Sequence, residues 1–260
     1  MIKLNMHVSG KGPNLVLIHG WAMSPLVWQE WLLDLAKSYR VICVELPGHG
    51  DSDYRERWQM NELLEAMAEQ LPDSCSVLGW SLGGMVALAY AGAYPQRVNK
   101  LLMLASSPKF VQSDDWQCAT TNSAFDAFSL GIKDKPAMTI KRFIKLQTQG
   151  VEQSKEMNAF LRGLVKTNVD DSHEGLVSGL DILRTNDLRG VLKSLTCRIL
   201  MVLGKKDQLV PVEAGQRSMS LNPNIDLCVI NNASHVPFLS HPLQVSQAID
   251  RFMRAGEGLL

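Results

Sequence analysis

Short apolar runs alternate with longer amphipathic stretches through the first hundred residues of the chain. The apolar runs end at turn residues and predict buried strands at 15–18, 41–44, 76–78 and 101–104. The stretches between them have helical spacing and predict helices at 27–35, 63–71 and 85–90. Because strands that alternate with helices pair in parallel, this pattern predicts a mostly parallel central sheet with helices on both faces.

Further strands are expected at the two ends of the chain. Residues 3–8 precede a glycine-containing turn and predict an antiparallel edge strand. Apolar runs at 199–203 and 225–230 extend the sheet in the second half of the sequence. We therefore expect a single α/β sheet to which both halves of the chain contribute.

The alternation of strands and helices is interrupted in the middle of the chain. After Pro108 the sequence becomes helical in pattern, with Ile140, Phe143 and Ile144 at positions i, i+3 and i+4. Strand character returns only after residue 188. We predict an α/β core made of residues 1–108 and 189–260, with a helical lid inserted at residues 109–188.

Length, charge and cysteine content narrow the class of protein. The 260 residues suffice for one large core, since open α/β sheets of about 200–250 residues form single domains. The 26 basic and 26 acidic residues balance, so nothing global favours nucleic acid or an anionic membrane as a partner. The sequence shows no signal-peptide or membrane-span pattern, and its five cysteines lack metal-ligand spacing. We expect a cytoplasmic monomer with reduced cysteines and no metal.

A strong chemical signal lies at the end of the third parallel strand. There Gly79, Ser81 and Gly83 stand at two-residue spacing, between an apolar run and a helix-forming run. Strand, tight turn and helix in this order form a nucleophile elbow, in which small neighbours permit the strained backbone of an exposed serine. The pattern predicts that Ser81 is a nucleophile.

A serine nucleophile requires a base and an acid that orients the base. Asp207 follows the strand 199–203 and His235 follows the strand 225–230, and loops after parallel strands meet at one edge of a sheet. Taken alone, Asp207 is a turn residue or helix cap and His235 is a surface histidine. Together with Ser81 they have the chain order Ser, Asp, His of this architecture, which predicts a catalytic triad.

The tetrahedral intermediate of such a reaction needs two amide donors for its oxyanion. One comes from the residue after the nucleophile, Leu82, and the other from the loop after an early strand, where Trp21 follows His19 and Gly20. The alternative for His19-Gly20 is a simple loop. The turn at 47–52, which contains three small residues, is assigned to structure and not to chemistry.

At this point the chain resembles the α/β-hydrolase superfamily from end to end, and it is more narrowly similar to the pimeloyl-acyl carrier protein methyl ester carboxylesterases of biotin synthesis. Superfamily motifs are common, whereas Trp80 inside the elbow and the insertion segments discriminate better. The residues that carry the resemblance are His19-Gly20-Trp21, Gly79-Trp80-Ser81-Leu82-Gly83-Gly84, Ala105-Ser106-Ser107-Pro108, Trp116, Arg142-Phe143, Leu146-Gln147-Thr148, Gly179-Leu180-Asp181-Ile182-Leu183, Asp187-Leu188-Arg189 and His235-Val236-Pro237-Phe238.

The resemblance implies an α/β-hydrolase fold and a serine esterase that needs no cofactor. It implies that Ser81, Asp207 and His235 are catalytic. It further implies that the substrate is contacted by Trp21, Leu82, Phe143, Ile144, Lys145, Leu146 and Gln147. The apolar members of the last segment also fit a role in helix packing. One departure is Ala22, where many relatives have glycine, and it leaves the breadth of the oxyanion loop open.

One stretch of the insertion is basic although the whole chain is neutral. Between residues 133 and 166 the net charge is +5, and such a stretch is either a solvated helix surface or a docking surface for an acidic partner. Acyl carrier proteins are acidic, and we expect Arg142, Lys155 and Arg162 to contact one. The basic residues are Lys133, Lys135, Lys141, Arg142, Lys145, Lys155, Arg162 and Lys166, and the acidic ones are Asp134, Glu152 and Glu156.

Docking would also select between the two reactive groups of the implied substrate. If the carrier rests on the lid, its extended acyl chain brings the distal methyl ester to Ser81 and leaves the thioester outside. The alternatives on the same fold are a general short-chain carboxylesterase, a lactone or carbon–carbon bond hydrolase, and a non-enzymatic ligand receptor. Haloalkane and epoxide hydrolases are disfavoured, since they require an acid at position 81.

Overall fold

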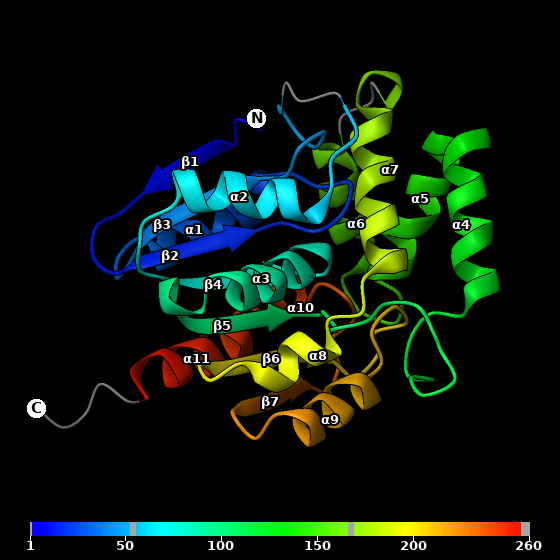
Figure 1. Cartoon of the computed structure of the whole chain (residues 1–260). Coiled ribbons are helices and arrows are strands. Elements are labelled where there is room, and N and C mark those ends of the chain that lie inside the picture. The colour runs from blue at the N-terminus through cyan, green and yellow to red at the C-terminus, as the bar shows by residue number, and fades with distance from the viewer. Residues whose placement is uncertain (1, 53–55, 166–168, 256–260) are drawn as a thin grey trace, which may run out of the picture.

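The computed structural model describes residues 2–52, 56–165 and 169–255. Seven strands in this part of the chain form one sheet in the order β1-β3-β2-β4-β5-β6-β7 (Figure 1). Only the pair β1 and β3 is antiparallel, and the other five pairs are parallel. The strands are β1 (Asn5–Ser9), β2 (Asn14–Ile18), β3 (Arg40–Glu45), β4 (Cys75–Trp80), β5 (Val98–Leu104), β6 (Arg198–Gly204) and β7 (Ile225–Ile230).

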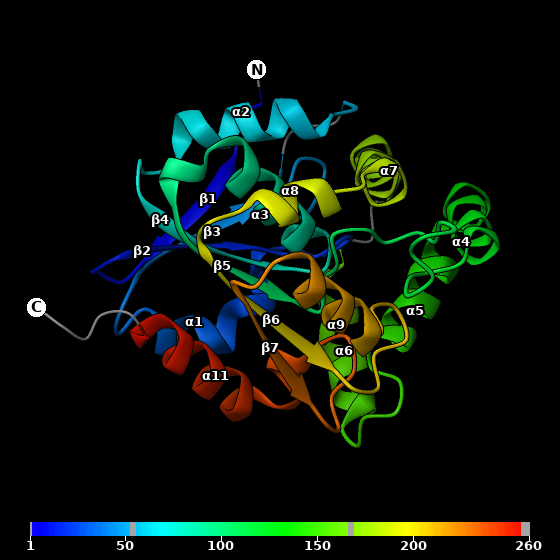
Figure 2. The ribbon, with the colours of Figure 1, turned by 60° about the horizontal axis from the view of Figure 1, so that its bottom comes forward.

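Helices cover both faces of this sheet, as the alternating pattern predicts (Figure 2). On one face lie α2 (Met60–Gln70), α3 (Leu82–Ala93), α8 (Arg189–Ser194) and α9 (Val212–Leu221). On the other lie α1 (Gln29–Leu35) and α11 (Pro242–Arg254). Shorter elements are η1 (Pro25–Trp28), η2 (Pro95–Arg97) and α10 (Pro237–Ser240).

The centre of the sheet is the most deeply buried part of the molecule. Leu15 to Ile18 in β2 and Leu101 to Leu104 in β5 have no exposed surface, because both faces of these strands are covered. The helix α3 is also buried on every side from Leu82 to Ala91, since it packs between the sheet and its neighbours α2 and α8. This central position fixes the start of α3 firmly relative to the carboxyl ends of the strands.

The edge strand and the first helix depart slightly from the predicted bounds. The antiparallel strand covers Asn5–Ser9 and not residues 3–8, because its register is set by pairing with β3, where Asn5 lies opposite Glu45. The helix predicted at residues 27–35 begins as the 3-10 turn η1, with Pro25 in its first turn, and continues as α1. Proline favours that position because it has no amide hydrogen to leave unpaired.

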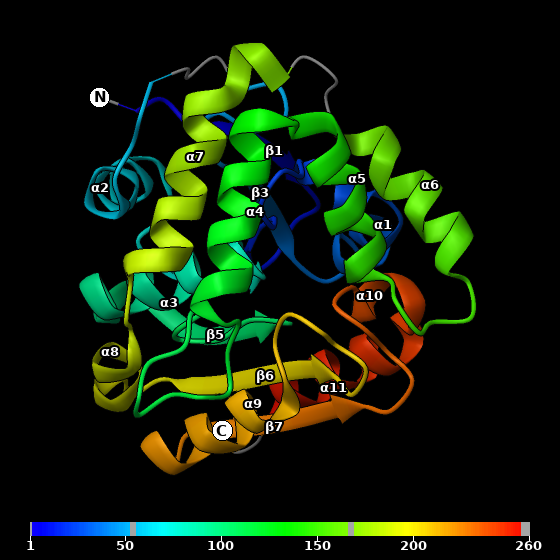
Figure 3. The same ribbon diagram turned by 90° about the vertical axis from the view of Figure 1, so that its right-hand side faces the viewer.

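Four helices lie beyond the carboxyl ends of the strands (Figure 1, Figure 3). They are α4 (Asn122–Asp134), α5 (Pro136–Gln147), α6 (Ser154–Leu164) and α7 (Val169–Thr185). None of the helices in the described part of the chain is long and apolar enough to cross a membrane.

The prediction that helical structure starts near Lys109 is wrong. Residues 109–121 form an irregular loop with two isolated bridges, Val111 with Thr120 and Ser113 with Trp116. Polar residues in this stretch bond the loop's own backbone, as the Gln112 side chain does with the Gln117 carbonyl. The first helix of the insertion, α4, begins only at Asn122, and the hydroxyl of its N-cap residue Thr121 accepts a hydrogen bond from the Ala124 amide.

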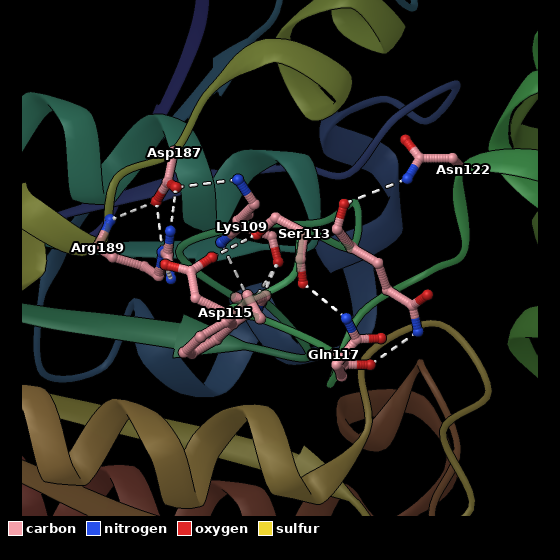
Figure 4. A network of polar contacts seen from close by, with 10 residues as sticks. Lys109, Ser113, Asp115, Gln117, Asn122, Asp187 and Arg189 are labelled. Atoms are coloured by element: carbon pink, nitrogen blue, oxygen red, sulfur yellow. Dashed lines mark hydrogen bonds and ion pairs between the residues drawn. The ribbon is translucent and has the colours of Figure 1, made fainter.

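The two connections between the core and these helices are joined at their base (Figure 4). Asp187 accepts hydrogen bonds from Lys109 at 2.9 Å and from Arg189 at 2.6 Å, and Arg189 also bonds Asp115 at 2.8 Å. The backbone adds a bond from the Leu188 amide to the Pro108 carbonyl. The segments through which the chain enters and leaves the insertion are therefore bonded to each other.

The indole of Trp116 lies beside this network. The guanidinium groups of Arg189 and Arg217 each stand 5.4 Å from its ring, and the residue is 2% exposed. Such cation–π contacts add to the attraction that holds the loop against the core. The residues Trp116, Asp187 and Arg189, all noted in the sequence as part of a family pattern, thus meet in space.

Candidate active site

Ser81 occupies a strained turn between β4 and α3. Its φ of 56° and ψ of −119° lie where residues with side chains are rarely found. A Cβ at Gly79 would stand 2.1 Å from the Gly83 carbonyl oxygen, and one at Gly83 would stand 2.2 Å from that of Ile18. A larger residue at either position would clash with these backbone carbonyl oxygens, so the tight turn requires both glycines.

The structure brings the side chains of Ser81, His235 and Asp207 together. The Ser81 Oγ lies 2.9 Å from His235 Nε2, and His235 Nδ1 lies 2.8 Å from Asp207 Oδ2. All three residues are nearly inaccessible to solvent, with the histidine and aspartate side chains at most 1% exposed. A hydrogen-bonded chain from hydroxyl to imidazole to carboxylate therefore spans three loops at the carboxyl edge of the sheet.

The Asp207 carboxylate has a fixed direction. Its Oδ1 accepts hydrogen bonds from the amides of Leu209 at 2.8 Å and Val210 at 3.1 Å, which leaves Oδ2 for the imidazole. The aspartate is thus both a turn residue, as its neighbours suggest, and the partner of His235.

The backbone of His235 is held from two sides. Its amide donates to the Gln147 carbonyl at 3.0 Å, and its carbonyl accepts a 2.8 Å bond from Trp80 Nε1. Trp80 precedes the nucleophile, whereas Gln147 ends the helix α5 of the insertion. The position of the imidazole is therefore tied both to the elbow and to the helices above it.

The loop after β2 places the amide of Trp21 near the elbow. The ring of Trp80 fills the space where Gly20 would have a Cβ, at 2.9 Å, so this loop approaches the elbow closely. Ala22 has a φ of 60°, the conformation that a glycine would adopt more easily. Neither the Trp21 amide nor the Leu82 amide donates to an acceptor within the described residues, as expected for two donors kept for a ligand.

The indole of Trp21 connects this loop to the inserted helices. Its Nε1 donates to the Leu176 carbonyl in α7 at 2.8 Å, and its ring lies edge-on to Phe128 and Phe143, both at 5.3 Å. Gly179 makes room for it, since a Cβ there would stand 2.9 Å from the indole. The side chain of Trp21 therefore contacts α4, α5 and α7.

A cavity of about 470 Å³ lies between the inserted helices and the core, with Ser81 and Trp21 in its wall. Its lining is mostly apolar, which suits an alkyl chain. Of the segment 143–147, the cavity wall contains Phe143 and Leu146, and the guanidinium-bearing Arg142 joins them. Thr120 and Thr139 add two hydroxyl groups.

The other three residues of the segment lie away from the cavity wall. Ile144 is 1% exposed and packs in the core, because it is on the inner side of α5. Lys145 is exposed to solvent, and Gln147 is buried with its carbonyl on the amide of His235. For these three, and for Leu82, contact with a substrate stays a prediction.

Sequence reasoning missed most of the cavity wall. Paired apolar residues three positions apart, in α4 and α7, are a helical pattern that identifies a buried face without saying what it covers. A loop phenylalanine and a leucine beside Asp207 have no sequence signal of this kind. The large apolar residues that were missed are Phe110, Phe125, Phe128, Leu180, Leu183 and Leu209.

Seven basic residues of the stretch 133–166 are exposed on α4, α5 and α6 and on the turn that joins the first two. None of the seven forms an ion pair with a carboxylate in the part of the chain that the structure describes. Lys166 lies outside the described residues. The seven are Lys133, Lys135, Lys141, Arg142, Lys145, Lys155 and Arg162.

No group of three or more His, Cys, Asp or Glu side chains among the described residues has the arrangement of a metal site. What the geometry offers is a serine hydroxyl bonded to an imidazole, an oriented carboxylate and two free amides beside an apolar cavity. This set can carry out acyl transfer through a serine ester.

Comparison with known proteins gives matches along almost the whole chain. The model of the alpha/beta hydrolase fold family matches residues 13–242. The pimeloyl-[acyl-carrier protein] methyl ester esterase of Nitrosospira multiformis is 34% identical over 97% of this chain and 99% of its own length. The esterase of the same name from Pectobacterium atrosepticum is 36% identical over 98% of this chain and 100% of its own length.

Solved structures agree in fold. An esterase from Exiguobacterium antarcticum superimposes with a TM-score of 0.89, at 24% identity over 98% of this chain and 96% of that one. The enol-lactonase from Burkholderia xenovorans has a TM-score of 0.83, at 16% identity over 96% of each chain. At such identities the likeness extends to the fold and no further.

Proposed function

The chain belongs to the α/β-hydrolase family and, within it, to the pimeloyl-[acyl-carrier protein] methyl ester esterases; on this premise we propose that it hydrolyses the methyl ester of pimeloyl-[acyl-carrier protein] methyl ester in biotin biosynthesis. The products are pimeloyl-[acyl-carrier protein] and methanol. The single observation that carries this function is the hydrogen-bonded chain of Ser81, His235 and Asp207, with Ser81 in the wall of an apolar cavity.

In the acylation step, Ser81 is the nucleophile and His235 the base. As Oγ forms a bond to the ester carbonyl carbon, its proton passes to His235 Nε2 across the 2.9 Å contact. The Asp207 carboxylate accepts a hydrogen bond from Nδ1–H of the ring, which fixes the tautomer and stabilises the imidazolium. When the intermediate collapses, the bond between acyl carbon and methoxy oxygen breaks, and His235 returns the proton to form methanol.

The Trp21 and Leu82 amides stabilise the charge that develops on the carbonyl oxygen. Neither amide has an acceptor among the described residues, so within this part of the chain no bond is lost when the oxyanion forms. In the second step His235 removes a proton from water, which attacks the acyl-enzyme and releases the carboxylate. Ser81 regains its proton and the site returns to its starting state.

We further propose that residues 109–188 act as a lid over the core and select the ester by distance. The four helices cover the cavity, and Arg142 is both exposed and part of the cavity wall. An acyl chain that passes this residue would reach Ser81 with its far end. The thioester, next to the carrier, would then stay outside the cavity.

The carrier is proposed to dock on the exposed basic residues of α5 and α6, among them Arg142, Lys155 and Arg162. An acidic protein would be attracted by seven cations that lack carboxylate partners within the described chain. Their net positive field also orients the approach, because the rest of the neutral chain must carry the balancing negative charge.

The proposal assumes a monomer in the cytoplasm. All five cysteines are unpaired, which agrees with a reducing compartment. Burial raises the pKa of Cys43 to about 12 and that of Cys75 to about 11, so these thiols stay protonated and unreactive at neutral pH.

A serine-directed phosphonate tests the assignment of the nucleophile. The wild-type protein should gain one phosphonate mass, mapped to the peptide that contains Ser81, and should lose ester hydrolysis in parallel. The Ser81→Ala variant should gain none and should hydrolyse esters at least about 10³-fold more slowly, while its melting temperature stays close to that of the wild type. Labelling of another residue with loss of activity would overturn the assignment.

A further inference from the structure

The two amides assigned to the oxyanion hole share an arrangement that the catalytic scheme does not use. Each amide belongs to a planar peptide whose carbonyl points the opposite way. For Trp21 that carbonyl is Gly20 O, and for Leu82 it is Ser81 O. In both cases a fully buried side chain from the core donates a hydrogen bond to the carbonyl.

Ser106 bonds the peptide between Ser81 and Leu82. Its hydroxyl donates to the Ser81 carbonyl at 2.8 Å, and the residue has no exposed surface. The amides of Gly84 and Met85 donate to the same oxygen at 3.0 and 3.3 Å, as in the first turn of any helix. Ser106 differs from them because it follows β5, so its bond fixes the peptide relative to the neighbouring strand.

His19 bonds the peptide between Gly20 and Trp21. Its Nε2 accepts a hydrogen bond from the Leu46 amide at 3.0 Å, so the ring proton must be on Nδ1. From there it donates to the Gly20 carbonyl at 2.8 Å. The ring thereby links the loop after β2 to the residue after β3.

The tautomer of His19 is the same throughout the neutral pH range. Burial, and then the nearby ring of His49, lower the pKa of His19 to about 3. At neutral pH the ring has one proton, and the Leu46 amide keeps that proton on Nδ1. The bond to Gly20 is therefore present throughout the neutral range.

Backbone strain is concentrated around the same two peptides. Among the described residues other than glycine, positive φ values occur at Ala22, Ser81 and Ala105. Ala22 follows one donor residue, Ser81 precedes the other, and Ala105 precedes Ser106. Residues persist in such conformations where the surrounding structure fixes them, and they cluster at functional sites.

We propose that His19 and Ser106 are positioning residues of the oxyanion hole, each aiming one donor amide through the carbonyl of the same peptide. A bond to the carbonyl also polarises the peptide and strengthens its N–H as a donor. The proposal rests on the proposed esterase function, in which Trp21 and Leu82 bind the oxyanion. Neither positioning side chain needs to touch the substrate.

Ser106→Ala and Ser107→Ala form a matched pair of variants. Both serines are buried, but the Ser107 hydroxyl donates to the Lys109 carbonyl, outside the hole. Ser106→Ala should lower kcat on a small methyl ester about tenfold, less than the loss of an oxyanion donor itself, with KM unchanged. Ser107→Ala should keep the wild-type kcat.

A trifluoromethyl ketone separates positioning from a general loss of structure. The Ser81 oxygen adds to the carbonyl carbon of this inhibitor, and the carbonyl oxygen becomes an oxyanion. The inhibition constant should therefore rise in Ser106→Ala by the same factor as kcat falls. Wild-type kcat and inhibition constant in Ser106→Ala, or equal losses in Ser107→Ala, would overturn the role of Ser106. A change in melting temperature alone would count against it as well.

His19 is tested by two replacements, asparagine and glutamine. Each keeps one of its two hydrogen bonds, either the one to the Gly20 carbonyl or the one from the Leu46 amide. Asparagine places an N–H near the position of Nδ1 and can still donate to Gly20, whereas glutamine reaches the position of Nε2 toward Leu46. His19→Asn should retain most of kcat, and His19→Gln should lose about tenfold. A kcat for His19→Gln equal to or above that of His19→Asn would overturn the role of His19.

The outcomes also distinguish this proposal from the function on which it rests. A wild-type protein without esterase activity would contradict the proposed function. An active wild type whose kcat is unaffected by Ser106→Ala and His19→Gln would contradict the positioning roles alone.

Discussion

Trp80 Nε1 donates a hydrogen bond to the carbonyl oxygen of His235 at 2.8 Å, so the residue just before the nucleophile holds the backbone of the proposed base. The Trp80 ring also packs against Phe238, with 5.2 Å between centroids, and lies 5.9 Å from the imidazole. The elbow therefore positions both partners of the proton transfer.

Replacing Trp80 with phenylalanine should lower kcat about tenfold with little change in KM. The change keeps an aromatic ring but removes the N–H, so the His235 loop loses a buried bond and the imidazole its fixed position. Steady-state kinetics on a small ester measure the effect. Trp31→Phe is the control, since Trp31 loses an equivalent 2.8 Å bond to Ser246 away from the site and should keep kcat. Equal kinetics for the two variants would contradict the role of Trp80.

Asp207→Asn should reduce kcat by about 10³-fold or more while the fold is retained. An asparagine oxygen can still accept the amides of Leu209 and Val210, but the side chain is neutral and cannot stabilise an imidazolium. Activity and a thermal melt are measured together. Asp226→Asn, at an exposed carboxylate paired with Arg198, serves as the control and should leave kcat unchanged. Substantial turnover by Asp207→Asn would argue for a different acid.

Charge reversal on the lid should weaken recognition of the carrier and leave the chemistry intact. The triple variant Arg142→Glu, Lys155→Glu and Arg162→Glu should raise KM for the carrier-linked methyl ester about tenfold or more. The wild type and the triple variant should have similar kcat values on that substrate. Added salt should raise the wild-type KM, because exposed charges are screened.

Two comparisons make the docking test specific. Reversal of Lys11, Lys37 and Lys193, all exposed on the core, changes the net charge equally and should leave KM near the wild-type value. The free methyl ester, which has no carrier, should show no salt dependence with any variant. If both triple variants raise KM alike, net charge and not the lid surface determines binding.

Asp187→Asn should destabilise the fold by about 1 kcal/mol at neutral pH, as for a well-ordered ion pair at the surface. Hydrogen bonds from Arg189, and then from Lys109, hold the pKa of the Asp187 carboxyl well below its usual range. Its stabilising contribution is therefore fully present above the usual pKa of about 4 and is lost as pH falls through the lowered one.

Denaturant unfolding of the wild type and Asp187→Asn across pH 7 to 3 measures this contribution. The difference in unfolding free energy should be constant at the upper end and should shrink toward acid pH. If the difference in unfolding free energy stayed constant or grew as the pH fell, the lowered pKa of Asp187 would not be the source of this contribution.

Much of this fold was predictable from local pattern. The strands at β2, β3, β5, β6 and β7 are apolar runs bounded by turns, and burial on both faces of a parallel sheet produces that signal directly. The edge strand shifted by a residue or two because pairing, and not pattern, sets its register. Helical structure was wrongly predicted for residues 109–121, because this loop is held by long-range contacts of Trp116 and Arg189, which no local signal shows.

The candidate site followed the same division. Ser81, Asp207 and His235 were predicted because strand ends, chain order and glycine spacing are all visible in sequence, and the structure places them within hydrogen-bond distance. The cavity wall was mostly not predicted, since residues such as Phe110 and Leu209 reach it only through the packing of loops. Ser106 and His19 were seen as motif residues, but the peptides they bond become apparent only in three dimensions.

Mass analysis of the carrier after incubation with enzyme tests the central claim most directly. Wild-type protein should convert the methyl ester of pimeloyl-[acyl-carrier protein] to a species lighter by one CH₂ unit, with the acyl chain still attached to the carrier, and Ser81→Ala should leave the mass unchanged. Release of the whole acyl group from the carrier, or equal conversion by Ser81→Ala, would contradict the account.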